Sequence, residues 1–109
     1  MAATVKFESN LDAFLDATPE QIEQALIAIG MTAETYAKEL CPVDTGRLRN
    51  SISHAVDMSE QAAIIGSNVE YAAYVELGTS RQKAKPYLRP AAENHSFEYK
   101  ALAQTALKS

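Results

Sequence analysis

A carboxylate, a hydroxyl and a glycine stand together at Asp44, Thr45 and Gly46, a combination that catalytic and metal-binding loops also use. A metal site here would need about two further acidic or histidine ligands nearby, and the sequence places none at a suitable spacing. The two side chains can instead hydrogen-bond the backbone, and the glycine can adopt conformations that other residues resist. We therefore predict a structural corner at these three residues and no metal site.

The histidines and the cysteine are too isolated to indicate nucleophilic catalysis. His54 and His95 have no serine, cysteine or paired carboxylate at the spacing of a catalytic triad, and Cys41 is the only cysteine. The sequence also lacks a glycine-rich phosphate loop and a dinucleotide-binding motif. We expect neither catalytic residues nor a cofactor. A small hydrolase built from His54, Asp44 and Glu76 is an alternative.

Charged residues that could dock a partner follow the corner. Arg47 and Arg49 carry guanidinium groups that suit pairing across a subunit boundary with carboxylates of the acidic first helix. Alternatively both are solvated, because exposed ion pairs stabilise a protein little. Glu76 could pair with Arg89 or Arg47, or it could cap a helix or face solvent. We interpret all four as docking candidates.

A second cluster of basic residues lies in the segment 79–89. Arg81, Lys83, Lys85 and Arg89 crowd a stretch without acids, whereas the first 44 residues are strongly acidic. Such asymmetry suits electrostatic docking between copies or onto a partner. The alternatives are a mobile surface loop and contact with DNA in a channel, so a small nucleic-acid-binding adaptor is the second function class. The net charge of -4 argues against a general nucleic-acid binder.

The elements that position these residues fit one domain over residues 1–109, with an α+β fold. Thr18-Pro19-Glu20-Gln21 combines a hydroxyl N-cap, a proline at the first helical position and a glutamine at the third, which predicts the start of a helix. Pro42 ends that helix near Leu40. Gly30 interrupts it and predicts a close packing neighbour. The apolar stripe of the helix comprises Ile22, Ala25, Leu26, Ile29, Ala33, Tyr36, Ala37 and Leu40.

A small antiparallel sheet and a C-terminal helix complete the expected fold. Alternation at Val5 and Phe7 predicts a short strand, and residues 53–58 and 62–67 predict a hairpin. Gly66 predicts a bulge or a close approach. Residues 71–77 favour a short helix that Gly78 ends. Pro86 and Pro90 bracket the next three residues, and from there one C-terminal helix is expected through Ala91, Ala92, Phe97, Ala101, Leu102, Ala106 and Leu107.

Three segments in order resemble the gene-product-ten-like family of siphophage tail-component, tail-completion and head-tail neck proteins. They are Pro42-Val43-Asp44-Thr45-Gly46-Arg47-Leu48-Arg49-Asn50-Ser51-Ile52, Tyr71-Ala72-Ala73-Tyr74-Val75-Glu76-Leu77-Gly78-Thr79 and Lys85-Pro86-Tyr87-Leu88-Arg89-Pro90-Ala91. The likeness covers nearly the whole chain. Cys41 stands where the family commonly has alanine, and Leu77 where an aromatic residue is usual.

The resemblance implies a virion structural protein of the tail or head-tail neck, without catalytic activity. It implies a ring of identical copies that docks onto other neck or tail proteins of a phage or prophage. Such a protein is made in the cytoplasm of the host bacterium. We expect no membrane partner, because no apolar run approaches the roughly 20 residues of a membrane span.

Overall fold

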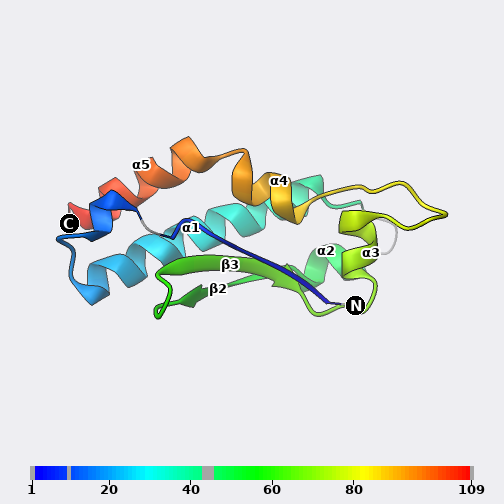
Figure 1. Ribbon diagram of the computed structural model, residues 1–109, viewed down its shortest axis with the longest axis horizontal. Helices are drawn as coiled ribbons and strands as arrows, with labels where there is room; N and C mark the ends of the chain where they lie inside the picture. Colours follow the sequence, from blue (N-terminus) through cyan, green and yellow to red (C-terminus); the bar gives the residue numbers. More distant parts are fainter. Residues whose placement is uncertain (1, 10, 43–45, 109) are drawn as a thin grey trace.

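Helices lie on one side of a small antiparallel sheet in the computed structural model, which describes residues 2–9, 11–42 and 46–108 (Figure 1). This arrangement confirms the predicted α+β class. The elements in chain order are β1 (Ala3–Phe7), η1 (Asp12–Phe14), α1 (Pro19–Leu40), α2 (Arg47–Ser51), β2 (Ser53–Asp57), β3 (Ala62–Ser67), α3 (Ala72–Leu77), α4 (Leu88–Glu93) and α5 (Ser96–Leu107).

The long helix α1 begins as the sequence predicts. The Thr18 hydroxyl accepts a hydrogen bond from the Gln21 amide at 3.2 Å, and the Gln21 side chain accepts one from the Thr18 amide at 2.9 Å. This capping box satisfies two amides that a helix start leaves without intrahelical partners. The helix ends at Leu40, before Pro42. Its buried face comprises Ile22, Ala25, Leu26, Ile29, Gly30, Ala33 and Ala37.

The three strands pair in the order β1-β3-β2, and both pairings are antiparallel. The predicted hairpin is confirmed, with β2 ending one residue earlier than expected. Helix α1 packs on β2 and β3, and α4 packs on β1. The predicted close approach at Gly66 is also confirmed, because a Cβ there would lie 2.5 Å from the carbonyl oxygen of Ala3. The register at Gly66 is continuous, so the alternative of a bulge is wrong.

The neighbour of Gly30 is His54 on β2. A Cβ atom at position 30 would lie 3.2 Å from both Cβ and Cδ2 of His54. The imidazole Nδ1 lies 2.8 Å from Glu34, which also binds Lys38 at 3.1 Å. Burial raises the pKa of Glu34, but the hydrogen bonds from His54 and Lys38 outweigh it and lower the pKa overall.

The expected single C-terminal helix is wrong, because the chain breaks at Asn94 and His95 into α4 and α5. The break lets α4 pack on β1 while α5 packs along α1. The His95 ring stacks on Tyr36, with ring centroids 3.7 Å apart, which fixes the turn against α1. Tertiary packing rather than a helix-breaking residue therefore sets this boundary.

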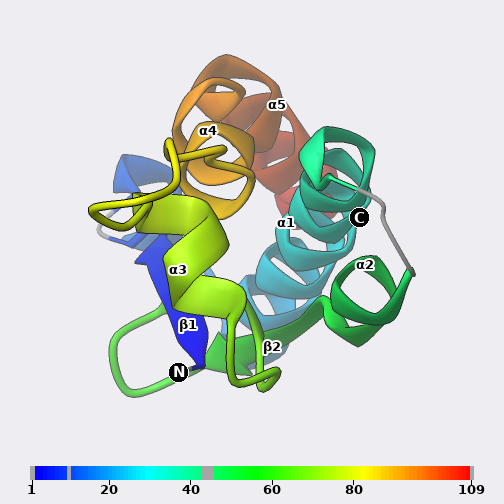
Figure 2. The same ribbon diagram turned by 90° about the vertical axis from the view of Figure 1, so that its right-hand side faces the viewer.

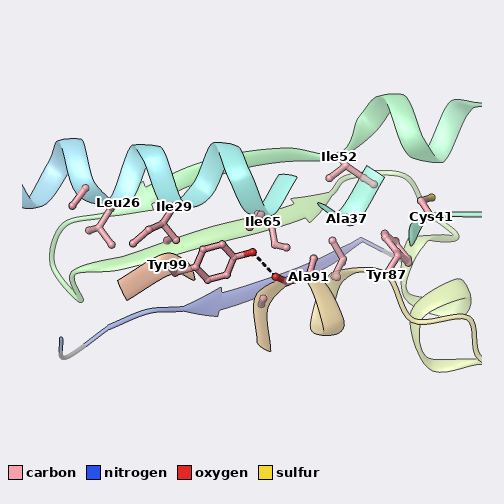
Figure 3. Close-up of a cluster of buried hydrophobic side chains, with 14 of the residues drawn as sticks. Leu26, Ile29, Ala37, Cys41, Ile52, Ile65, Tyr87, Ala91 and Tyr99 are labelled. Atoms are coloured by element: carbon pink, nitrogen blue, oxygen red, sulfur yellow. Dashed lines mark hydrogen bonds between the residues drawn. The ribbon is translucent and has the colours of Figure 1, made fainter. Parts of the chain in front are cut away.

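Two tyrosines at the centre of the core keep their hydroxyl groups hydrogen-bonded (Figure 3). The Tyr99 hydroxyl donates to the carbonyl of Ala91 at 2.5 Å, and the Tyr87 hydroxyl donates to that of Ala72 at 3.1 Å. Burial raises the pKa of both phenols. These bonds tie α4 to its two neighbours, α5 and α3, because a buried hydroxyl without a partner would be costly.

The molecule is elongated, with extents of 48 × 22 × 21 Å. One end holds η1 and the start of α1, and the other holds α2, α3 and the loop between α3 and α4 (Figure 1). Figure 2 looks onto the second end, where that loop stands in front of α4. No helix in the described ranges is long and apolar enough to cross a membrane.

Candidate docking surfaces

Glu76 is buried, with 8% of its surface exposed, and it organises one end of the molecule. Its carboxylate accepts hydrogen bonds from the backbone amides of Tyr87 at 2.9 Å, Leu88 at 2.8 Å and Arg89 at 3.1 Å. These are the amides at the start of α4, whose own N-cap residue supplies no side-chain bond. Of the alternatives raised by the sequence, the helix cap is therefore the one that the structure shows.

The alternative in which the Glu76 side chain pairs with the side chain of Arg89 or Arg47 is wrong. The guanidinium of Arg89 pairs with Glu93 at 3.2 Å, and only its backbone amide contacts Glu76. The guanidinium of Arg47 binds both carboxylate oxygens of Glu70, at 3.1 and 2.9 Å. The reason is that Glu76 is buried and its carboxylate already accepts hydrogen bonds from three backbone amides at the start of α4.

Arg47 thus forms its ion pair within the chain. Its guanidinium also lies 5.5 Å from the ring centre of Tyr71. The hydrogen bond between the partners raises the pKa of Arg47 and lowers that of Glu70. Both side chains are more than half exposed, so water screens the pair and it stabilises the fold little. Arg49 lines a surface depression together with Glu34 and Glu39 of α1.

The predicted structural corner is described only in part. Asp44 and Thr45 lie outside the described residues. Gly46 has a φ of 81°, and its carbonyl accepts a hydrogen bond from the Asn50 amide at 2.9 Å as α2 begins. Leu48 and Ile52, one helical turn apart after this corner, are both buried.

The loop after α3 is a hydrogen-bonded hairpin that projects from the end of the molecule (Figures 1 and 2). Thr79 and Gln82 exchange two backbone hydrogen bonds of 2.9 and 3.3 Å, and the Lys85 amide returns to the carbonyl of Val75 at 2.8 Å. Gly78 makes the turn possible, since its φ is 79° and a Cβ there would lie 2.7 Å from the Ala84 nitrogen.

The hairpin presents positive charge beside apolar side chains. Arg81, Lys83 and Lys85 are exposed, and none of them forms an ion pair with a residue in the described ranges. Tyr74 and Leu77 on α3 are 49% and 74% exposed. We call this surface the basic end, which comprises Tyr74, Leu77, Arg81, Lys83, Lys85 and Arg89.

A surface of opposite charge lies at the other end of the long axis (Figure 1). It includes Leu15, which is 81% exposed. Its carboxylates are also exposed, and the part of the chain that the structure describes offers them no ion-pair partner. We call this surface the acidic end, which comprises Asp12, Leu15, Asp16, Glu20 and Glu23. The sequence showed these carboxylates but not that they gather opposite the hairpin.

The residues of the alternative hydrolase are not brought together. His54 lies against Gly30 and Glu34 of α1, whereas Glu76 caps α4, and Asp44 is outside the described residues. Among the described residues no group of three histidine, cysteine or acidic side chains is placed to hold a metal ion.

Comparison with known proteins identifies the family. Neither the curated proteins nor the solved structures contain a match. The model of the HK97-gp10-like family, bacteriophage tail components, matches residues 5–78, from β1 to the end of α3. The matched part includes the Pro42 to Ile52 segment and most of the Tyr71 to Thr79 segment, and the basic hairpin lies beyond it. The chain therefore belongs to the HK97-gp10-like family of bacteriophage tail components.

Proposed function

We propose that this chain is a structural protein of the tail or head-tail neck of a phage or prophage virion. In this proposal residues 1–109 act as one domain, which assembles with identical copies into a ring and docks onto neighbouring virion proteins. Its role is assembly, without a reaction centre. Membership of the tail-component family supports the location in the virion.

One observation carries the docking role. Arg81, Lys83 and Lys85 of the basic end form no ion pair among the described residues. Their loop returns to α3, where Tyr74 and Leu77 are exposed. An exposed aromatic or aliphatic group within a ring of charge is typical of protein interfaces, where the apolar centre is desolvated and the charged rim sets orientation. Arg47 contributes less to this role, because Glu70 of the same chain already holds its guanidinium.

The second candidate is a nucleic-acid-binding adaptor that uses residues 79–89. The exposed cluster of Arg81, Lys83 and Lys85 favours it. Binding to DNA would then fall steeply as salt is added, because phosphate contacts release counterions. A DNA titration without that salt dependence would exclude this candidate.

Genetic complementation tests the main proposal. In a phage from which this coding sequence is deleted, we expect particles with unjoined heads and tails or incomplete tails, seen by electron microscopy. Wild-type protein supplied from a plasmid should restore infectious particles and should be found in them by mass spectrometry. Intact, infectious virions without the protein would refute the proposal.

A further inference from the structure

The two ends of the molecule each carry an exposed leucine together with charged side chains, and the charges are opposite in sign. The basic end combines the exposed Leu77 with the cations of the following loop, and the acidic end combines the exposed Leu15 with the carboxylates of η1 and the first turns of α1. These leucines are 74% and 81% exposed, which places them among the most exposed large apolar side chains of the described residues. Each end thus combines an exposed leucine with charged side chains, and the charges of the two ends are opposite in sign.

The two ends cannot meet within one copy. They lie at opposite ends of an axis 48 Å long, and ordered helices and strands separate them (Figure 1). A contact between two different patches on identical chains is heterologous, so it leaves one patch of each kind free to bind the next copy. Such contacts close into a ring or extend into a filament, depending on the rotation between neighbours.

We propose that the basic end of one copy binds the acidic end of the next, with the Arg81–Lys85 hairpin facing the turn between η1 and α1. This inference rests on the proposed function and names the surfaces by which copies associate. A second copy explains both ends, because the cations of the hairpin meet the carboxylates around Leu15. A nucleic acid would account for the basic end alone, since its phosphates repel the acidic end.

Charge exchange tests the pairing of the two ends. The basic-end variant is Arg81→Glu, Lys83→Glu and Lys85→Glu, and the acidic-end variant is Asp16→Lys, Glu20→Lys and Glu23→Lys. All six positions are exposed, so both variants should keep the wild-type circular dichroism spectrum. A control introduces three glutamates at exposed positions away from both surfaces, by Thr35→Glu, Ala55→Glu and Ser96→Glu.

Association is measured at low ionic strength by sedimentation velocity and by the concentration dependence of amide chemical shifts, which detects dissociation constants up to about 1 mM. In the wild-type protein, the amide chemical shifts of residues at both ends should change as the protein concentration rises. Each reversed variant alone should associate at least about tenfold more weakly, because like charges then face each other. An equimolar mixture of the two variants should restore association to within about threefold, and the control should keep it within about threefold of wild type.

Several results would overturn the inference. One is that the wild-type spectra do not change with protein concentration up to about 1 mM. Another is that each charge-reversed variant alone associates as strongly as wild type. A third is that the mixture of the two variants does not restore association. Loss of salt-dependent binding to a short DNA duplex in the basic-end variant, with association unchanged, would assign this end to nucleic acid. None of these results would refute the proposed function, which complementation of the deleted phage tests separately.

Discussion

The carboxylate of Glu76 lies 2.8 Å from the backbone amide of Leu88, twelve residues further along the chain. This contact joins the end of α3 to the start of α4 and closes the hairpin that forms the basic end. The position of Arg81, Lys83 and Lys85 therefore depends on the buried carboxylate of Glu76, which does not itself lie on the docking surface.

Removing this cap should destabilise the fold. Glu76→Ala leaves the amides of Tyr87, Leu88 and Arg89 without their acceptor, and we expect a loss of about 2 to 4 kcal/mol in the free energy of unfolding. Urea denaturation of the variant and the wild-type protein measures this loss in the free energy of unfolding. The control is Glu93→Ala, which breaks only an exposed ion pair with Arg89 and should cost less than about 1 kcal/mol. Equal losses in the two variants would contradict the capping role.

The sequence alone predicted elements whose signals are local. The capping box at Thr18 and Gln21, the hairpin 53–67 and the stop at Gly78 depend on neighbours within a few residues, so each could be predicted before the structure was known. The basic and acidic clusters were visible for the same reason. The placement of these clusters at opposite ends could not be predicted, because it follows from how the helices and strands pack along the long axis.

Contacts between distant residues could not be predicted. The cap of α4 by Glu76 spans eleven to thirteen residues, and the Arg47–Glu70 pair spans 23. The break at Asn94 lacks a proline or glycine. It exists because α4 packs on both α1 and β1, whereas α5 packs along α1. These features depend on tertiary packing, which a single sequence does not display.

The loop between α3 and α4 should not tolerate a side chain at Gly78. An added Cβ would lie 2.7 Å from the Ala84 nitrogen at a φ of 79°, so we expect Gly78→Ala to lose about 2 to 4 kcal/mol of stability. Gly46 has a similar φ of 81°, but among the described residues the nearest atom to a Cβ there would be the Asn50 side-chain nitrogen, 3.7 Å away. Gly46→Ala should therefore cost only about 1 kcal/mol in urea denaturation. A loss in Gly78→Ala no larger than this would show that the hairpin tolerates a side chain there.

Gly30 and His54 should be energetically coupled. Gly30→Ala gains about 1 kcal/mol of helix propensity, but its Cβ would press on the His54 side chain at 3.2 Å. We expect Gly30→Ala to be more favourable by about 1 kcal/mol when His54 is also replaced by alanine. A double-mutant cycle from four unfolding curves measures this coupling. Strictly additive effects would indicate that the histidine ring moves aside freely.

Asp57 should make stability depend on pH in the acid range. Hydrogen bonds from Ser59, Lys6 and the Glu60 amide lower its pKa from 3.8 to about 2. Because the folded pKa lies below the unfolded one, its stabilising contribution is complete above about pH 4 and is lost as the pH falls towards 2. Asp57→Asn should therefore flatten the fall of stability over this range. Carboxyl NMR titration gives the pKa directly, and Ser59→Ala should raise it. An unchanged titration in Ser59→Ala would exclude the Ser59 bond as its main cause.

The arrangement of copies in the particle tests the central claim most directly. A cryo-electron-microscopy map of the purified phage tail and neck should contain this domain in a ring. The Arg81–Lys85 hairpin of each copy should lie against Leu15 and Glu20 of its neighbour. Absence of the domain from the particle, or a ring in which these two surfaces do not meet, would contradict the account.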